Sequence, residues 1–272
     1  FGNAYSGVFD LNFRTGNAEQ RESAFMIGVL GIEAATEGYF SKKSRASYLV
    51  NYRYSTLALM RHVLPSLGDQ LPTYHDLSFK IHVPTPIGSF SLFGLGGQST
   101  TLENTVADSS QWESALDAYG FELQQEVGII GLRHKLLLGD RTYVNTVISA
   151  STDNYTDLTQ QLLPEENYDL RAVDRTRSLS CQYRIHPQVN HKFNARHTLR
   201  TGAILSFLEF DYFYESRWDT TDWTRHMDQQ GNTYQIQSYA QWKYRLSEQW
   251  TLNTGVHGIL FRLNNTWAID PR

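Results

Sequence analysis

Large or apolar side chains alternate with polar ones along much of this sequence, and this period of two limits the possible folds more than any other feature. The clearest stretch is residues 234–247, where Tyr, Ile, Ala, Trp and Leu alternate with Gln, Lys and Arg, interrupted only by Ser238 and Tyr239. Successive side chains of a β-strand point to opposite faces, whereas an α-helix repeats about every 3.6 residues. The pattern predicts a strand with one apolar face and one polar face.

Other stretches of the chain show the same alternation. It is also present in residues 47–55, 77–83 and 179–186, and is less regular in 123–138, 141–151, 198–214 and 250–262. Aromatic residues make up 13% of the chain, and aromatic and β-branched side chains favour strands. We therefore predict an all-β fold with about eleven strands.

The predicted connections between these strands are short and long in turn. The short ones are 40–45, 84–88, 139–141, 187–196 and 246–249, and the long ones are 61–75, 97–118, 152–175 and 215–232. In an up-and-down barrel that crosses a membrane, every second connection lies on the same side, and outer-membrane barrels have short turns on one side and long loops on the other. A soluble Greek-key sandwich has no reason to show this regularity. The connections favour an antiparallel, up-and-down transmembrane β-barrel.

Such a barrel explains why the strands have two unlike faces. In hydrocarbon each unpaired backbone polar group costs several kcal/mol, so strands can span only as a closed sheet. Its outer face meets lipid and its inner face meets water or a plug. The chain ends in "TWAIDPR", which resembles the start of another strand. We therefore expect only part of a larger barrel here, with further strands after Arg272.

Several functional classes are disfavoured by the sequence. The 24 basic and 28 acidic residues are well mixed, which disfavours nucleic-acid binding, and the single cysteine, Cys181, disfavours a cysteine-rich metal site. No common catalytic, phosphate-binding or metalloenzyme motif is present. His186, His191 and His197 lie around a predicted turn without a carboxylate or thiol partner, so we interpret them as surface residues. We expect no enzymatic activity, cofactor or metal.

The beginning of the chain suggests a family. The segment "FGNAYSGVFDLNFRTGNAEQ" contains a short alternating strand at residues 6–13 and a Gly16-Asn17 exit, and "RESAFMIGVLGIEAATEGYF" and "ASYLVNYRYSTLALM" follow. These segments resemble the end of the plug and the first barrel strands of TonB-dependent outer-membrane receptors of the carboxypeptidase-regulatory-like subgroup. Tyr39 stands where that subgroup has proline, so the turn there is expected to differ.

The resemblance implies a domain organisation and a function. Residues 1–20 would be the C-terminal end of the plug domain and residues 21–272 the N-terminal half of the barrel. A tight reversal at Gly28 to Gly31 would make residues 22–39 a hairpin and give about twelve strands. The receptor would import a siderophore, vitamin, peptide or glycan across the bacterial outer membrane. Its partners would be the outer-membrane lipid bilayer and, through a more N-terminal part, the inner-membrane TonB complex.

Two sets of residues are candidates for ligand contact. Trp218, Trp223 and His226 lie in a predicted long loop, where exposed aromatic side chains can mark a binding surface for a sugar or a siderophore. The alternatives are that they belong to the upper aromatic girdle or pack against neighbouring loops. The polar face carries basic residues that line a path for an anionic ligand or pair with carboxylates of the plug. These are Arg53, Lys80, Arg184 and Arg245.

Two other functions fit the same alternation. One is an unplugged porin-like or adhesin-like barrel, in which residues 1–20 would form an ordinary wall strand. The other is a soluble β-rich binding module, in which the apolar faces would pack together in a core. The position of the N-terminal segment separates the receptor from the porin, and the exposure of the apolar face separates both from the soluble module.

Overall fold

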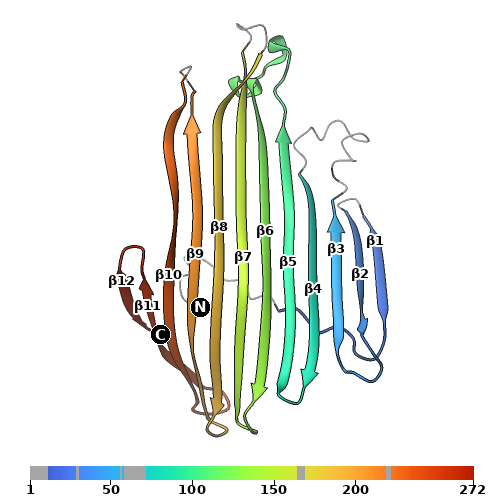
Figure 1. Ribbon diagram of the computed structural model, residues 1–272, viewed down its shortest axis with the longest axis vertical. Helices are drawn as coiled ribbons and strands as arrows, with labels where there is room; N and C mark the ends of the chain where they lie inside the picture. The colour runs from blue at the N-terminus through green and yellow to red at the C-terminus, as the bar shows by residue number, and fades with distance from the viewer. Residues whose placement is uncertain (1–11, 29–30, 56, 58–71, 164–168, 219–221) are drawn as a thin grey trace.

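The described part of the chain forms one antiparallel sheet of twelve strands in sequence order, each paired with its neighbours along the chain (Figure 1). The computed structural model describes residues 12–28, 31–55, 57, 72–163, 169–218 and 222–272. The all-β, up-and-down prediction is confirmed. The sheet is open, because its order begins at β1 and ends at β12 without a pairing between them.

The strands lengthen towards the middle of the sheet. Their bounds are β1 Glu22–Ile27, β2 Ile32–Tyr39, β3 Ser47–Tyr54, β4 Thr73–Thr85, β5 Gly88–Glu103, β6 Tyr119–Leu137, β7 Thr142–Leu163, β8 Asp169–Lys192, β9 His197–Ser216, β10 Thr224–Arg245, β11 Thr251–Phe261 and β12 Thr266–Pro271. The longest, β8, has 24 residues. At about 3.3 Å per residue such a strand is about 80 Å long.

The expected reversal between residues 28 and 31 is present. The Gly28 amide donates to the Gly31 carbonyl at 2.9 Å, and the Gly31 amide donates to the Gly28 carbonyl at 3.3 Å. β1 and β2 pair from this point, beginning with Ile27 opposite Ile32. The expected hairpin at residues 22–39 and the twelfth strand are therefore confirmed.

Two of the predicted long connections are wrong. β7 continues to Leu163 and β8 begins at Asp169, and β9 continues to Ser216 and β10 begins at Thr224. The sequence in these regions is polar on both faces, so it loses the alternation that marks a strand although the backbone pairing continues. Between β5 and β6 a connection does remain, and it contains two short 3-10 helices, Ser109–Gln111 and Ala115–Ala118. The predicted plug strand at 6–13 and the loop at 61–75 lie largely outside the described residues.

The two faces of the sheet have the reverse of the burial expected for a water-soluble fold. Among the described residues the buried hydrophobic ones are only Ala46, Ala118, Leu162 and Val173. On one face, which we call the apolar face, Ile148 is 52% exposed and Ile185 45% exposed. On the opposite, polar face, Ser206 is 2% exposed and Gln188 5% exposed. The side chains shielded from solvent are thus mainly polar, whereas the large apolar ones face outward.

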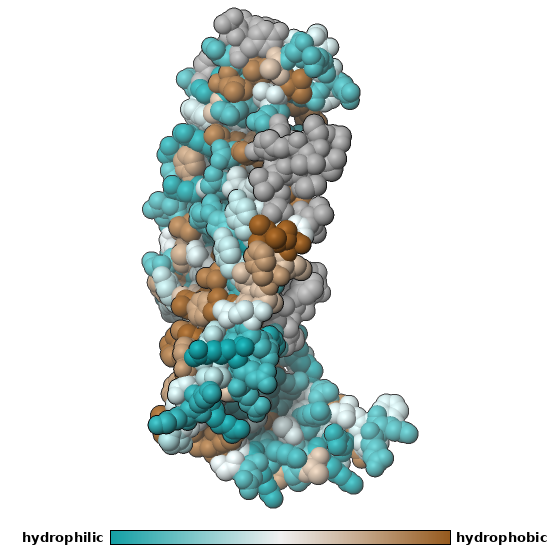
Figure 2. Space-filling view, turned by 90° about the vertical axis from the view of Figure 1, so that its right-hand side faces the viewer, coloured by the Kyte–Doolittle hydropathy of each residue, from teal (hydrophilic) through white to brown (hydrophobic). Residues whose placement is uncertain are grey.

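Strand register aligns the apolar side chains into one row across the sheet. Neighbouring strands place these residues directly opposite one another, and the row, which we call the central apolar row, comprises Tyr48, Ile81, Leu92, Leu132, Ile148, Ile185, Leu205, Ile236, Leu260 and Trp267. In the side view of Figure 2, hydrophobic residues gather in the lower half of the left-hand side. We call the central apolar row and the apolar residues beside it on the same face the apolar band.

Above this band the same face becomes charged and polar. Six residues along the strands from the central apolar row, the paired residues include Glu126 on β6, Asn154 on β7 and Gln98 on β5. On β9 the change is equally abrupt, because Phe207 is followed on the same face by Glu209 and Asp211. The apolar band therefore covers only the lower part of the long strands.

The turn between β4 and β5 requires a glycine. Gly88 has a φ of 110°, and a Cβ at this position would lie 2.4 Å from the carbonyl oxygen of Lys135. Gly139, in the turn between β6 and β7, also has a positive φ of 76° but has no atom within 4 Å of its Cβ position.

We expect Gly88→Ala to lower the free energy of unfolding more than Gly139→Ala does. The second variant meets only backbone strain, about 1 kcal/mol for a left-handed alanine, whereas the first meets a steric clash as well. Urea unfolding of both variants refolded in detergent micelles measures the difference. Equal losses in the two variants would show that the β4–β5 turn tolerates a Cβ.

Candidate functional site

Residues 12–20 lie on the polar face of the sheet and belong to none of its strands. The Lys80 ammonium on β4 donates to the Phe13 carbonyl at 2.8 Å. Arg14 forms an ion pair with Glu37 on β2, and the Asn17 amide donates to the same carboxylate at 2.9 Å. The segment therefore crosses the strands rather than extending the sheet (Figure 1). It is fixed at two points on either side of β3.

The other charges near this segment are compensated within the wall. Arg53 on β3 pairs with Asp76 on β4 at 2.7 Å. The Asn51 side-chain amide donates to Glu33 at 2.6 Å. At this edge of the sheet the polar face is thus a network of charges and amides whose partners are already present.

A polar hollow of about 460 Å³ lies farther along the same face, over β8 to β11. Its lining includes His186, Gln188, Arg200, Tyr239 and His257. The Tyr239 hydroxyl lies 2.8 Å from both His186 Nε2 and Gln188 Nε2, and Arg200 donates to Gln188 Oε1 at 3.3 Å. These contacts hold the lining side chains in a fixed arrangement around the hollow.

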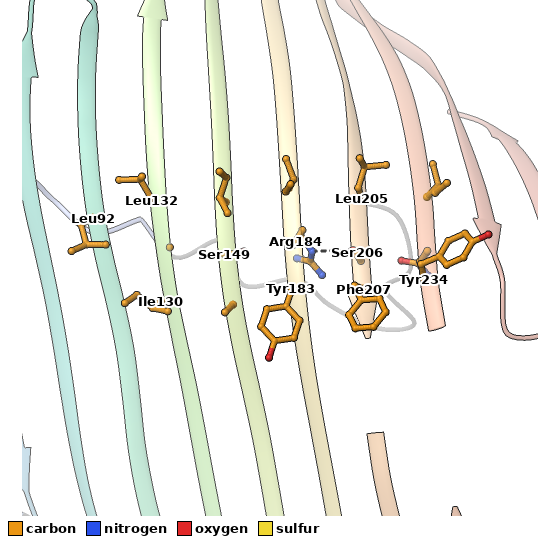
Figure 3. Close-up of a pocket in the computed structure, with 16 residues that line it drawn as sticks. Leu92, Ile130, Leu132, Ser149, Tyr183, Arg184, Leu205, Ser206, Phe207 and Tyr234 are labelled. Atoms are coloured by element: carbon orange, nitrogen blue, oxygen red, sulfur yellow. Dashed lines mark hydrogen bonds between the residues drawn. The ribbon is translucent and has the colours of Figure 1, made fainter. Parts of the chain in front are cut away.

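The apolar face has a hollow of different character, lined by Leu92, Ile130, Ile148, Ile185 and neighbouring residues, with a volume of about 640 Å³. In Figure 3, Tyr183 and Phe207 lie side by side on neighbouring strands, with Tyr234 beyond them. The ring centroids of Tyr183 and Phe207 are 6.3 Å apart. This row of aromatic rings follows the upper border of the apolar band.

The structure does not bring the three predicted loop residues together. Trp218 packs against Tyr119, with ring centroids 5.6 Å apart. Trp223 lies between two guanidinium groups, 4.5 Å from Arg175 and 4.7 Å from Arg217. Both tryptophans lie between β9 and β10, as predicted.

His226 was expected in a loop but lies within β10, which begins two residues earlier. The segment is polar on both faces, so its sequence lacks the alternation that predicts a strand. Its ring stacks on Tyr214 at 4.8 Å, and Nε2 lies 2.8 Å from the Ser216 hydroxyl. The pairing shifts by one residue between Arg225 and Met227, so a β-bulge turns this imidazole towards the polar face, where Tyr214 and Ser216 point.

Sequence reasoning missed the neighbours of these residues. Arg175, Arg217 and Tyr214 come from segments predicted as loop or as irregular strand, and only the β8–β9–β10 pairing places them beside Trp223 and His226. No local signal in the sequence marks these contacts. The register of three long strands decides them.

The three histidines considered for metal binding have separate partners. His186 contacts Tyr239, His191 lies 2.7 Å from the Thr142 hydroxyl, and His197 stacks on Tyr244 at 4.3 Å. The Trp242 indole donates to His197 Nδ1 at 3.1 Å. His191 and His197 thus belong to an aromatic group around the β8–β9 turn.

The connection between β5 and β6 is organised by hydrogen bonds of its own. The Ser110 hydroxyl and amide donate to Asp108 at 2.7 and 3.0 Å, and the Trp112 indole donates to the Val106 carbonyl at 2.7 Å. The Ser110 hydrogen bonds hold the pKa of Asp108 below its usual range. The carboxylate therefore stays ionised, and keeps capping the first 3-10 helix, as the pH falls towards the ordinary carboxyl range.

No protein-family model matches this sequence, and no curated protein matches it either. Within the described residues, no helix is both long and apolar enough to cross a membrane. The His, Cys, Asp and Glu side chains of the described ranges form no group of three that could hold a metal ion.

We expect a double-mutant cycle to couple Trp223 to Arg175 and not Trp218 to Arg175. A guanidinium over an indole at an exposed site contributes about 0.5–1 kcal/mol, which the cycle Trp223→Leu with Arg175→Met isolates. The matched cycle with Trp218→Leu should be additive within about 0.3 kcal/mol. Unfolding free energies of the single and double variants give both values, and equal coupling in the two cycles would contradict the contact.

Proposed function

We propose that this chain is part of a TonB-dependent receptor of the bacterial outer membrane, which imports a bound ligand. In this proposal β1–β12 form part of the transmembrane wall, and the segment before β1 is the end of the plug. The ligand class left open by the sequence is a siderophore, vitamin, peptide or glycan. The inner-membrane TonB complex would act through a more N-terminal part of the protein.

The observation that carries the proposal is the reversal of burial. A water-soluble sheet buries its apolar face, because burial of apolar surface contributes about 25 cal/mol per Å². Here the residues of the central apolar row face outward, and Ser206, Gln188 and Gln237 are among the most buried side chains. A hydrocarbon environment outside and a wet or plugged interior account for both facts. The soluble alternative requires the opposite arrangement.

The height of the apolar band also agrees with a bilayer. On β10 the band extends from Tyr234 to Tyr244, which is about 33 Å along a strand at about 3.3 Å per residue. A strand tilted by about 40° converts this length into a height of about 25 Å, the height of the apolar band in outer-membrane barrels. Trp242 and Tyr244 lie at the lower border and Tyr234 at the upper border, as in aromatic girdles.

The placement of residues 12–20 favours a plugged receptor over an unplugged porin. A porin would use this segment as a wall strand, whereas here Phe13, Arg14 and Asn17 bind the polar face through Lys80 and Glu37. In the proposed receptor this face is the lumen. The upper parts of β7 to β10 then project above the bilayer, where Trp218, Trp223 and His226 are the candidates for first contact with a ligand.

The first test replaces, one at a time, two neighbouring residues on opposite faces of β10 by lysine. Ile236 belongs to the central apolar row, and Gln235 points to the polar face. A lysine facing lipid at mid-membrane costs about 2–4 kcal/mol, and a lysine in a lumen does not. We expect Ile236→Lys to reduce insertion into lipid vesicles strongly and Gln235→Lys to leave it nearly unchanged, measured by protease protection.

Equal effects of the two lysines would contradict the assignment of faces. Insertion of both variants at the level of the parent chain would show that the band does not meet lipid. Fractionation of cells that express the chain behind an export signal gives an independent measurement, because the proposal places it with the outer membrane.

The second test concerns the attachment of the N-terminal segment. Glu37→Gln removes the ion pair with Arg14, and we expect trypsin to cleave at Arg14 about tenfold faster, because hydrogen bonds to charged groups are worth about 1.5–3 kcal/mol. Glu33→Gln is the matched control, since Glu33 lies on the same face of β2 but bonds to Asn51. Equal cleavage rates in the two variants would show that Glu37 does not hold the segment.

A further inference from the structure

The lower part of the polar face carries basic residues without acidic ones. Register places Asp76 on β4 in line with Asp153 on β7. Below that row, the described strands β4 to β11 carry no Asp or Glu side chain on the polar face, according to their sequence and pairing. Basic residues do occur there. We call four of them the basic strip: Lys80, Arg133, Arg184 and Arg200.

The four residues of the basic strip lie on different strands of the sheet, β4, β6, β8 and β9. Lys80 and Arg184 belong to one row, which runs through Gly131 on β6. Arg133 lies two positions from Gly131 on the same strand, so it stands between the two. Strands about 4.8 Å apart and a rise of about 3.3 Å per residue place the Cα atoms of Lys80 and Arg184 each about 12 Å from that of Arg133. Arg200 pairs with Asn190, six positions along β8 from Arg184.

None of these four cations has a carboxylate partner among the described residues. Arg184 donates to Gln182 Oε1 at 2.7 Å, and Arg200 donates to Gln188. Lys80 is bound to a backbone carbonyl. By contrast, Arg53 and Arg14, on the neighbouring part of the same face, each pair with an acid. The positive charge of the strip therefore remains uncompensated by the wall.

The strip also has unused hydrogen-bond donors in enclosed positions. Arg133 Nε and the Asn190 side-chain nitrogen are buried and have no hydrogen-bond partner. Asn190 is 8% exposed and pairs with Arg200, which lines the polar hollow described above. A buried donor without a partner costs free energy, which a bound acceptor that reaches it would recover.

The described N-terminal segment does not supply the missing negative charge. Residues 12–21 contain Arg14 and Arg21 as well as Glu19, so the segment has no acidic excess. The neutralising group must therefore come from outside this part of the chain. Walls of one charge focus the electric field and raise the local concentration of oppositely charged solutes.

We propose that the basic strip is a binding site for a polyanionic solute, one that carries several carboxylate or phosphate groups. This rests on the proposed function, because it requires the polar face to be a lumen open to solutes. Arg184 and Arg200 contact the anionic groups, and Arg133 and Lys80 extend the site across the wall. The ligand of the receptor is then a polyanion rather than a neutral glycan.

The test measures binding of three probes to the chain reconstituted in phosphatidylcholine vesicles. Linear tripolyphosphate and citrate represent the two anion chemistries, and maltotriose is the uncharged control. We expect an anion to bind and maltotriose not to bind, with an affinity that falls as salt is raised, because the Debye length is only about 8 Å at physiological ionic strength. Tripolyphosphate or citrate, whichever binds more tightly, identifies the preferred group.

Variants locate the site. Arg184→Gln and Arg200→Gln should each weaken binding of the anion about tenfold, and Arg200→Lys should restore most of it. The matched control, Arg177→Gln, removes the same charge from the apolar face, where Arg177 pairs with Asp211, and should leave binding unchanged. Equal loss in all variants would overturn the assignment, as would equal binding of maltotriose.

Fluorescence quenching separates failure of this inference from failure of the proposed function. Brominated lipids in the same vesicles quench tryptophans that face hydrocarbon, among which we expect Trp242 and Trp267. Quenching without anion binding overturns the basic strip and leaves the membrane assignment intact. Absence of quenching overturns both.

Discussion

The continuous backbone pairing from β1 to β12 is the constraint on which the rest of this structure depends. Each interior strand is hydrogen-bonded to a neighbour on either side, so the sheet does not rely on a packed apolar core to satisfy its polar backbone. The two faces are therefore free to meet different surroundings. The few buried hydrophobic residues among those described, such as Val173 and Leu162, lie near strand ends rather than in a central core.

The same pairing aligns properties that are spread over the whole sequence. The central apolar row combines residues from ten strands, β3 to β12, and their common height appears only through register. On the opposite face, register separates a lower region, whose four cations have no carboxylate partner among the described residues, from an upper region that contains Asp153 and Asp174. In the proposed receptor, this division would attract anions to the part of the lumen beside the plug segment.

The ends of the long strands show how a regular sheet creates irregular chemistry. A bulge in β10 turns His226 towards Tyr214 and Ser216, while Trp223, three residues earlier, lies between Arg175 and Arg217. One short segment thus supplies side chains to two different environments. Specific contacts at this end arise from strand pairing and one register shift, with little contribution from local sequence.

The sequence by itself determined the strands, the up-and-down order and which residues share a face, because the period of two is a local property of an extended backbone. The strand from Tyr234 to Leu246 could be predicted in this way, whereas the reversal at Gly28 was expected only from the family resemblance. Only the tertiary structure decided where β7 and β8 end, that Glu37 and Lys80 hold residues 12–20, and that Trp218, Trp223 and His226 diverge. These features depend on how strands distant in the sequence pair. Where a strand is polar on both faces, its sequence has no alternation from which that pairing could be predicted.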